Sequence, residues 1–386
     1  MKKILFLSGF GIFSTYPNPI CEVKIINALN NTSEVLIDIA CDGIVEKTQI
    51  LNWKNNPLYT IRRILRWPAY NPNVEIACRK ELSQILSNAM YDCIFVPHKP
   101  FETVYAACKI KKKYPGIKLF IYALDPIANE IDANNGIGKY LFFLTRYAEK
   151  NAFNTADHIF HMECNRKKYS NVKYSKYFDK FSFLDFPLIE HTERAENRTE
   201  KYDGSLVKLL YTGALDNTYR SPYYFLEVYN LISKNLSVEF HLYAKGNSIP
   251  KIEEMYKQNS SIKSFGYIPK KELERKIEEA DYLINIGNKF SSMLPSKILT
   301  YFMTGKPIIH IKSQETDSSI QYLEKYGLFL IIYESDPVEK SAKKLMDFIK
   351  NNYHKRLSST YVENKFEHNT PKWNAKQILK VLMNGT

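Results

Sequence analysis

One stretch near the end of the chain constrains the fold most, because it combines two buried strands with a helix between them. Residues 281–287, Asp-Tyr-Leu-Ile-Asn-Ile-Gly, and residues 307–311, Pro-Ile-Ile-His-Ile, are short apolar runs typical of buried strands. Between them, Pro295 and Ser296 indicate a helix start and Gly305 a helix stop. The order strand, loop, helix, strand predicts a parallel α/β sheet, and such sheets bind ligands at the carboxyl ends of their strands.

The predicted helix start suits an anion such as a diphosphate. The free backbone N–H groups of Ser296 and Lys297 would point out of the helix, where the helix dipole favours negative charge. The Ser296 hydroxyl adds a donor, and Lys297 adds a positive charge if it turns toward the ligand. The alternative is that Pro295 and Ser296 only cap a surface helix and that Lys297 is solvated, and this segment alone leaves both interpretations open.

The same segment resembles the donor-binding segment of GT-B glycosyltransferases, close to the retaining family 4 of bacterial surface-polysaccharide synthesis. The residues shared with the family pattern are Pro295, Ser296, Lys297, Tyr301, Gly305, Lys306 and Pro307. The chain departs at Thr300, where the family has the glutamate that holds the donor ribose. It departs again at Ser292, where some members carry a second carboxylate. One hydroxyl makes fewer and weaker bonds to a ribose diol than a carboxylate does.

Strands and helices alternate in two series on either side of a charged, apolar-poor segment. This alternation predicts doubly wound parallel sheets, and the resemblance implies the GT-B fold, with two Rossmann-like domains facing a central cleft. We expect an acceptor-side domain at residues 1–190, a linker at 191–205 and a nucleotide-sugar-binding domain at 206–370. The resemblance also implies that a last helix, 371–386, packs back on the first domain.

Two further segments of the second half resemble the donor domain of the family. Gly213 follows a predicted strand, and the family places basic residues beyond it against the diphosphate. Arg220 holds one such position, whereas the position directly after the glycine is Ala214. Arg220 would offset charge on the leaving diphosphate; the alternative is a solvated loop arginine. The segment Gly266-Tyr267-Ile268 resembles the backbone edge that reads the nucleotide base, or else it is an ordinary turn before a helix.

Candidate site residues in the first half follow predicted strands. The resemblance implies that His98 contacts the donor sugar, although a lone histidine is more often structural. Gly9 and Gly11 fit the loop near the acceptor and the diphosphate, but tight turns need glycines anyway. Asp125 would either orient an acceptor hydroxyl or cap the next element, and capping is the more ordinary role.

The charge of the chain points to acidic partners. The net charge is +13 and the pI about 9.1, which suits phosphates, anionic lipid or nucleic acid. Arg62, Arg63, Arg66 and Trp67 combine cations with an aromatic ring, a pattern typical of a membrane interface; the alternative is a merely basic, solvated face. We therefore expect a cytoplasmic protein, peripheral on the inner face of the plasma membrane.

Other function classes have less support in the sequence. The six cysteines, between Cys21 and Cys164, form no C-x-x-C pair, which argues against a zinc site and a disulfide framework. Because the chain contains no D-x-D motif, we expect no metal and no other cofactor. No helix-turn-helix, ribonucleoprotein signature or zinc ligand set supports a nucleic-acid-binding protein.

The sequence therefore predicts a glycosyltransferase that moves a sugar from a nucleotide-sugar to a lipid-linked glycan acceptor, in capsule, O-antigen or exopolysaccharide synthesis. Retention of anomeric configuration is implied by the resemblance alone. Because of Thr300 and Ala214, a GT-B relative with another activity, such as a nucleotide-sugar epimerase or an inactive scaffold, remains an alternative.

Overall fold

The computed structural model describes residues 1–13, 17–48, 71–128, 136–190, 201–257, 259–289, 294 and 296–384. The chain divides into two compact units. Unit 1 comprises Met1–Leu188 together with His368–Thr386, and unit 2 comprises Ile189–Glu367. Each unit contains one six-stranded sheet, and each is described separately below.

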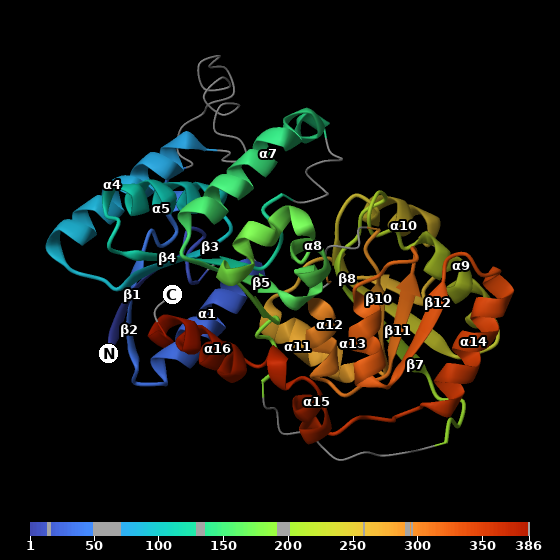
Figure 1. Cartoon of the computed structure of the whole chain (residues 1–386). Coiled ribbons are helices and arrows are strands. Elements are labelled where there is room, and N and C mark those ends of the chain that lie inside the picture. Colours follow the sequence, from blue (N-terminus) through green and yellow to red (C-terminus); the bar gives the residue numbers. More distant parts are fainter. Residues whose placement is uncertain are drawn as a thin grey trace. The chain divides into compact units, whose positions relative to one another are not determined.

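Unit 1 is built around a parallel sheet of order β2-β1-β3-β4-β5-β6. Its strands are β1 (Lys2–Leu7), β2 (Val35–Ala40), β3 (Cys93–Pro97), β4 (Lys118–Ala123), β5 (His158–Met162) and β6 (Phe181–Leu184). Its helices are α1 (Pro17–Asn30), α2 (Ile44–Thr48), α4 (Pro72–Asn88), α5 (Phe101–Lys113), α7 (Gly136–Thr155), α8 (Arg166–Tyr169) and α16 (Pro371–Asn384). Helices α4, α5 and α7 lie on one face of the sheet, and α1 and α16 lie on the other (Figure 1).

Unit 2 repeats this arrangement with the sheet order β12-β11-β10-β7-β8-β9, again parallel. Its strands are β7 (Val207–Ala214), β8 (Val238–Lys245), β9 (Ile262–Ser264), β10 (Tyr282–Ile286), β11 (Ile308–Lys312) and β12 (Phe329–Tyr333). Its helices are α9 (Tyr223–Ile232), α10 (Ile249–Met255), α11 (Lys270–Glu279), α12 (Lys297–Phe302), α13 (Ser319–Tyr326), α14 (Val338–Asn351) and α15 (Ser359–Lys365).

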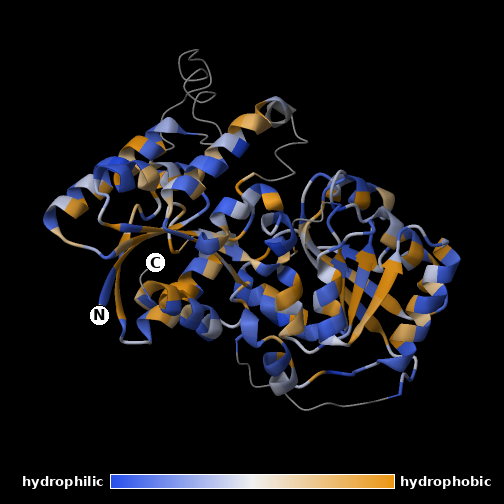
Figure 2. Cartoon of the chain, in the orientation of Figure 1, coloured by the Kyte–Doolittle hydropathy of each residue, from blue (hydrophilic) through white to orange (hydrophobic). Residues whose placement is uncertain are grey.

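The inner strands of both sheets are apolar along most of their length because helices cover both faces. Every residue of β3 and of β10 is buried, as expected for strands in a parallel sheet. The central strands of unit 2 are accordingly coloured hydrophobic in Figure 2. The two doubly wound sheets confirm the α/β class that the alternating pattern predicts.

The structure also contains elements that the pattern did not indicate. Strand β6 is only four residues long and follows a polar 3-10 segment, Val172–Lys180, so it has too little periodicity to be recognised. Helix α12 is shorter than expected: it spans six residues and ends at Phe302. Gly305, with φ 69°, lies three residues beyond that end.

Candidate functional site

The loop after β7 holds Arg220 in a defined position. Arg220 Nε donates to Asn288 Oδ1 at 2.9 Å, and its Nη1 reaches the Ala214 carbonyl at 3.4 Å. The Asp216 backbone pairs with that of Arg220 in both directions, at 3.1 and 3.0 Å. A guanidinium has five N–H donors, so these contacts orient the Arg220 fork while leaving donors for a ligand.

The loops after β7 and β8 are tied together by amide side chains. Asp216 Oδ1 accepts from the Thr218 N–H at 2.7 Å, and Asp216 Oδ2 accepts from Asn247 Nδ2 at 2.8 Å. Asn247 Oδ1 in turn accepts from the Asn217 N–H at 3.0 Å. A Cβ on Gly246 would lie 1.9 Å from the Leu215 carbonyl oxygen, so the close approach of the loops requires a glycine there.

Lys297 extends over the end of β7. Gly213 has φ 134°, and a Cβ added to it would lie 3.4 Å from Lys297 Nζ. The Lys297 side chain as a whole is exposed, but its ammonium lies 3.4 Å from Thr212 Oγ1. The buried Tyr301 hydroxyl accepts from the Thr212 N–H at 2.9 Å, which fixes α12 against β7. Thus Gly213, Arg220 and Lys297, three residues that the sequence singled out, lie at the same end of the sheet.

A third cation joins this end of the sheet and was not recognised in the sequence. Lys245 is the last residue of β8 and is the direct strand neighbour of Ala214. Its ammonium lies 5.7 Å from the centre of the exposed Tyr267 ring. The sequence indicated only that the basic residue expected at Ala214 is missing. The strand register then shows that Lys245 supplies a positive charge beside that position.

The electrostatic consequence is visible at Lys297. Burial of the ammonium, followed by the positive charges of Arg220 and Lys245, lowers the pKa of Lys297 to about 8. Cations that repel one another around a residue without a side chain form a place where an anion is stabilised. We call Arg220, Lys245 and Lys297 the cationic cluster.

The other predicted residues of unit 2 lie near the cluster in the sequence, but their side chains are exposed or make no capping hydrogen bond. Ser296 precedes α12 and makes no capping hydrogen bond with its side chain. Thr300 is exposed, one helical turn after Lys297. Gly266 has φ 64° in the loop between β9 and α11, and Ile268 in the same loop is half-buried.

Lys306, which belongs to the family pattern, has a structural role here. Its side chain is buried, and its ammonium donates to the Ile277 carbonyl at 2.9 Å and to the carbonyls of Glu278 and Ala280. These carbonyls lie at the carboxyl end of α11, where a cation is favourable. Lys306 therefore binds the end of a helix within unit 2.

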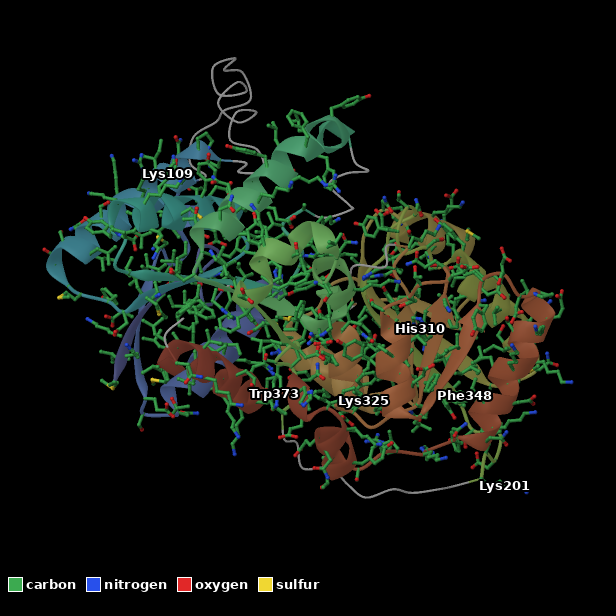
Figure 3. All side chains as sticks on the ribbon, in the orientation of Figure 1. Lys109, Lys201, His310, Lys325, Phe348 and Trp373 are labelled. Carbon is green, nitrogen blue, oxygen red and sulfur yellow. The ribbon has the colours of Figure 1, made fainter. Side chains whose placement is uncertain are left out.

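A buried polar network lies beside the carboxyl ends of β10 and β11. His310, labelled in Figure 3, bonds Asn285 Nδ2 through Nδ1 at 2.8 Å and Asp317 Oδ2 through Nε2 at 3.0 Å. Burial alone would raise the pKa of Asp317, but the bonds from His310 and from the Ser319 N–H hold it below its usual value. A Cβ on Gly287 would lie 2.3 Å from Asp317 Oδ2. Both imidazole nitrogens are satisfied, so the network organises the sheet edge.

In unit 1 the glycine loop after β1 has packing reasons for both glycines. A Cβ on Gly9 would lie 2.5 Å from Pro100 Cδ, so no other residue fits there. Gly11 has φ 90°, and its N–H donates to the Ser8 carbonyl at 2.9 Å. These contacts explain the glycines without a ligand, and their donor-binding role stays a prediction.

His98 and Asp125 follow β3 and β4 at the same edge of the sheet of unit 1. His98 is buried, and neither of its ring nitrogens has a hydrogen-bond partner among the residues that the structure describes. Burial, with smaller contributions from Lys99 and His161, lowers the pKa of His98 well below its usual value. Asp125 Oδ2 lies 3.8 Å from Lys99 Nζ. A buried neutral imidazole without a partner is costly, which favours a functional interpretation of His98.

Glu22 of α1 was not recognised in the sequence. It is buried, and it accepts a hydrogen bond from Ser8 Oγ at 3.3 Å. Burial raises the pKa of Glu22 to about 8, against which the Ser8 bond acts weakly. The nearby Tyr122 hydroxyl is buried without a partner in the described part of the chain, and burial raises its pKa as well. A single glutamate in a helix carries no local sign that it is buried.

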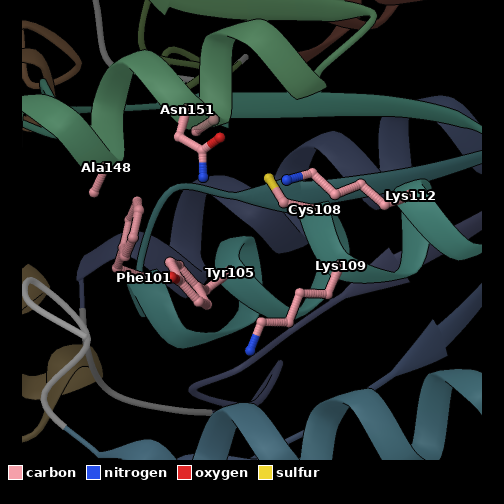
Figure 4. Close-up of a pocket in the computed structure, with 8 residues that line it drawn as sticks. Phe101, Tyr105, Cys108, Lys109, Lys112, Ala148 and Asn151 are labelled. Atoms are coloured by element: carbon pink, nitrogen blue, oxygen red, sulfur yellow. The ribbon is translucent and has the colours of Figure 1, made fainter. Parts of the chain in front are cut away.

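A small hollow of about 60 Å³ lies between α5 and α7 of unit 1 (Figure 4). Residues of α5 that line it include Tyr105, Cys108, Lys109 and Lys112, and Asn151 lines it from α7. The predicted site residues of the described ranges do not line this hollow.

Some predicted residues fall outside the described ranges. These are Pro295, Ser292 and the membrane candidates Arg62, Arg63, Arg66 and Trp67. Within the described ranges, the structure contains no group of three or more His, Cys, Asp or Glu side chains able to hold a metal ion. Nor does any helix in those ranges have both the length and the hydrophobicity of a membrane span.

The two doubly wound parallel sheets define the fold class: the chain has the GT-B fold, as predicted. Across its whole length it is similar to sucrose-phosphate synthase from Thermosynechococcus elongatus (11% identity, 100% and 99% of the two chains covered, TM-score 0.67). It is also similar to Anabaena HepE, solved in complex with UDP and glucose (12%, 100% and 100%, TM-score 0.57). A third similar structure is the UDP-GlcNAc 2-epimerase from Methanocaldococcus jannaschii (14%, 100% and 100%, TM-score 0.56).

Comparison by sequence adds no closer relative. No known protein family matches the chain, and no curated protein matches it in sequence.

Proposed function

We propose that the protein is a glycosyltransferase that uses a nucleoside-diphosphate sugar, with the cationic cluster binding the diphosphate. The observation that carries this proposal is the gathering of Arg220, Lys245 and Lys297 around Gly213 at the carboxyl end of β7. Guanidinium and ammonium groups are the usual protein partners of phosphate oxygens. Support also comes from the fold shared with HepE, which was solved with UDP and glucose.

Each cation has a role in this proposal. The remaining donors of Arg220 bind a phosphate oxygen and stabilise the charge that develops on the leaving diphosphate. Lys297, whose side chain lies over Gly213, contacts the second phosphate. Lys245 takes the place of the basic residue that the family has at Ala214, and it stands beside Tyr267, whose loop we assign to the nucleotide base.

Two further residues complete the proposed donor site in unit 2. Ser296 and Thr300 contribute hydroxyls toward the ribose and phosphate, in place of the family's carboxylate. The contact of His98, which belongs to unit 1 and is neutral because it is buried, with the donor sugar stays a prediction from the resemblance.

We propose a lipid-linked glycan acceptor, in capsule, O-antigen or exopolysaccharide synthesis, and transfer with retention. The net charge of +13 supports work at an anionic surface. The basic segment Arg62, Arg63, Arg66 and Trp67 stays a prediction for that surface. Asp125 stays the proposed acceptor-side residue.

A second candidate is a nucleotide-sugar epimerase. It is favoured by the fold shared with the UDP-GlcNAc 2-epimerase and by the absence of the family's ribose carboxylate at Thr300. Such an enzyme would need the same diphosphate contacts, so the cationic cluster does not separate the two functions.

Thermal denaturation with a panel of nucleoside diphosphates tests the donor site. We expect one base to stabilise the protein by a clear margin, because a ligand that binds only the folded state raises its stability. Product analysis with the matching nucleotide-sugars, with and without an isoprenoid-diphosphate sugar acceptor, then separates the candidates. Transfer requires the acceptor, whereas an epimerase changes the donor without it. No stabilisation by any nucleotide would overturn both.

A further inference from the structure

One face of α7 carries an unusual set of exposed side chains. From residue 140 to residue 150 of this helix, the exposed side chains are Tyr140, Phe143, Arg146, Tyr147 and Lys150. Tyr140, Phe143 and Tyr147 are 76%, 65% and 71% exposed. The spacing of three and four residues puts all five on one stripe of the helix.

The opposite face of α7 anchors the helix to unit 1. Ala148, Ala152 and Phe153 are buried in the core of that unit. The one acid between residues 140 and 150, Glu149, is buried too, and it accepts hydrogen bonds from the hydroxyls of Tyr169 and Tyr174 at 2.8 and 2.9 Å. The exposed stripe is therefore held outward and carries only aromatic rings and positive charge.

Neighbouring cations extend the positive surface. Helix α5 packs against α7 and ends in three lysines, of which Lys112 and Lys113 are exposed. Lys112 lines the hollow between the two helices together with Asn151 (Figure 4). The other lysines nearby are already paired: Lys109 with Glu75 at 3.1 Å and Lys111 with Asp157 at 2.9 Å. Lys112 thus adds positive charge beside α7, and Lys113 adds more at the end of α5.

Large aromatic rings at this exposure call for a partner, and the charge around them selects its chemistry. Figure 2 colours part of α7 near its start as hydrophobic. Aromatic rings beside such a stretch suit the region between headgroups and acyl chains. Arginine and lysine on the same stripe suit lipid phosphates, and an acid that would repel them is not exposed there.

We propose that the α7 stripe, Tyr140, Phe143, Arg146, Tyr147 and Lys150, docks the protein on an anionic bilayer. The rings enter the headgroup region, and the two cations contact lipid phosphates. This proposal deepens the proposed function. It rests on that function for the idea that the acceptor lies in a membrane, whereas the exposed stripe is observed independently of it.

Vesicle flotation tests the proposal. We compare vesicles of phosphatidylcholine alone with vesicles that also contain phosphatidylglycerol. The variant Tyr140→Ser/Phe143→Ser/Tyr147→Ser should bind the anionic vesicles more weakly than the wild type, by about tenfold or more. The variant Arg146→Gln/Lys150→Gln should lose much of the preference for phosphatidylglycerol and of the salt dependence. A matched control, Met90→Ser/Val172→Ser, removes apolar side chains that are 92% and 80% exposed elsewhere on unit 1 and should bind as the wild type does.

A tryptophan reporter adds a direct readout. The fluorescence emission of the added tryptophan is the spectrum of the variant minus that of the wild type. With anionic vesicles this difference spectrum should shift to the blue for Phe143→Trp and should not shift for Val172→Trp. Wild-type binding by the triple serine variant would overturn the proposal. It would also be overturned if that variant turned a lipid-free dimer into a monomer, because the stripe would then be covered by a second copy.

Binding of a nucleoside diphosphate in lipid-free solution keeps the two proposals separate. The triple serine variant should bind it as the wild type does, because the stripe belongs to unit 1 and the cationic cluster to unit 2. If the wild type binds none, the proposed function fails while the vesicle result stands.

Discussion

At the scale of single residues, the cationic cluster has testable energetics. Replacing Arg220, Lys245 or Lys297 by alanine should each raise the dissociation constant of the preferred nucleoside diphosphate about tenfold to a hundredfold. The reason is that a hydrogen bond to a charged group contributes about 1.5–3 kcal/mol. Calorimetry on each variant measures this. Lys271→Ala, a change of an exposed lysine on α11, is the matched control. Wild-type affinity in any of the three would remove that residue from the site.

The lowered pKa of Lys297 predicts a pH dependence. Without ligand, Lys297 loses its proton as the pH rises through about 8, whereas a bound diphosphate holds the proton on. Affinity should therefore be flat below about pH 8 and fall above it, with proton uptake on binding. The stability of the free protein changes with pH in the opposite direction to the affinity. Its free energy of unfolding rises between about pH 8 and pH 10.5, because only the unfolded chain keeps the proton on Lys297 in that range.

Titration calorimetry in buffers of different ionisation enthalpy measures this proton uptake. Lys297→Met should abolish it, because the group that titrates is gone. The same uptake in Lys297→Met as in the wild type would assign the proton to another group.

Glu22 predicts a pH dependence of stability in unit 1. Its folded pKa of about 8 lies above the ordinary glutamate value of 4.5, so the folded chain holds a proton that the unfolded chain releases. Stability should fall as the pH rises from about 4.5 to about 8, with a slope of at most ~1.4 kcal/mol per pH unit. Urea unfolding of Glu22→Gln should show a flatter profile and a gain over the wild type that is largest near pH 8. Glu254→Gln, at an exposed position of α10, should leave the profile unchanged.

At the scale of elements, α12 carries the departure from the family at Thr300. Because Thr300 is exposed, Thr300→Glu should fold normally. We expect it to tighten nucleoside diphosphate binding severalfold, by about 1 kcal/mol, because a carboxylate accepts two bonds from the ribose diol. Calorimetry with Thr300→Gln as the uncharged control measures this. Clearly weaker binding by a folded Thr300→Glu would mean that the new carboxylate pairs with Lys297 or repels the diphosphate, and that this helix does not face the ribose.

The helices and strands were largely predictable, because strands buried in a parallel sheet consist of continuous runs of apolar residues. The runs at 281–287 and 307–311, for example, become β10 and β11, with bounds that differ by one residue at each end. What escaped prediction depends on contacts distant in sequence. Lys245 matters because strand register puts it beside Ala214, and Glu22 is unusual because Ser8 and the core enclose it. Local patterns show polarity, but burial and strand neighbours follow only from the folded chain.

At the scale of the whole molecule, α16 joins the end of the chain to unit 1, where it packs against α1. Ile378 of α16 and Leu345 of α14 are both fully buried, one in each unit. Ile378→Ala and Leu345→Ala should each cost about 2–5 kcal/mol, the first in unit 1 and the second in unit 2. The chain supplies a selective probe, because its three tryptophans, Trp53, Trp67 and Trp373, all fall within the residue ranges of unit 1.

Tryptophan fluorescence and circular dichroism during urea unfolding can therefore follow the units separately. Fluorescence reports the unfolding of unit 1, whereas circular dichroism reports both units. Ile378→Ala should shift the fluorescence transition to lower urea. Leu345→Ala should leave the fluorescence transition in place and should shift only the part of the dichroism transition that belongs to unit 2. A nucleoside diphosphate should move that same part upward, because the cationic cluster lies in unit 2. If Leu345→Ala and the nucleotide shift the fluorescence transition by as much as they shift the dichroism, the two units unfold as one cooperative body. The separate stabilities that two independent cores imply would then be wrong.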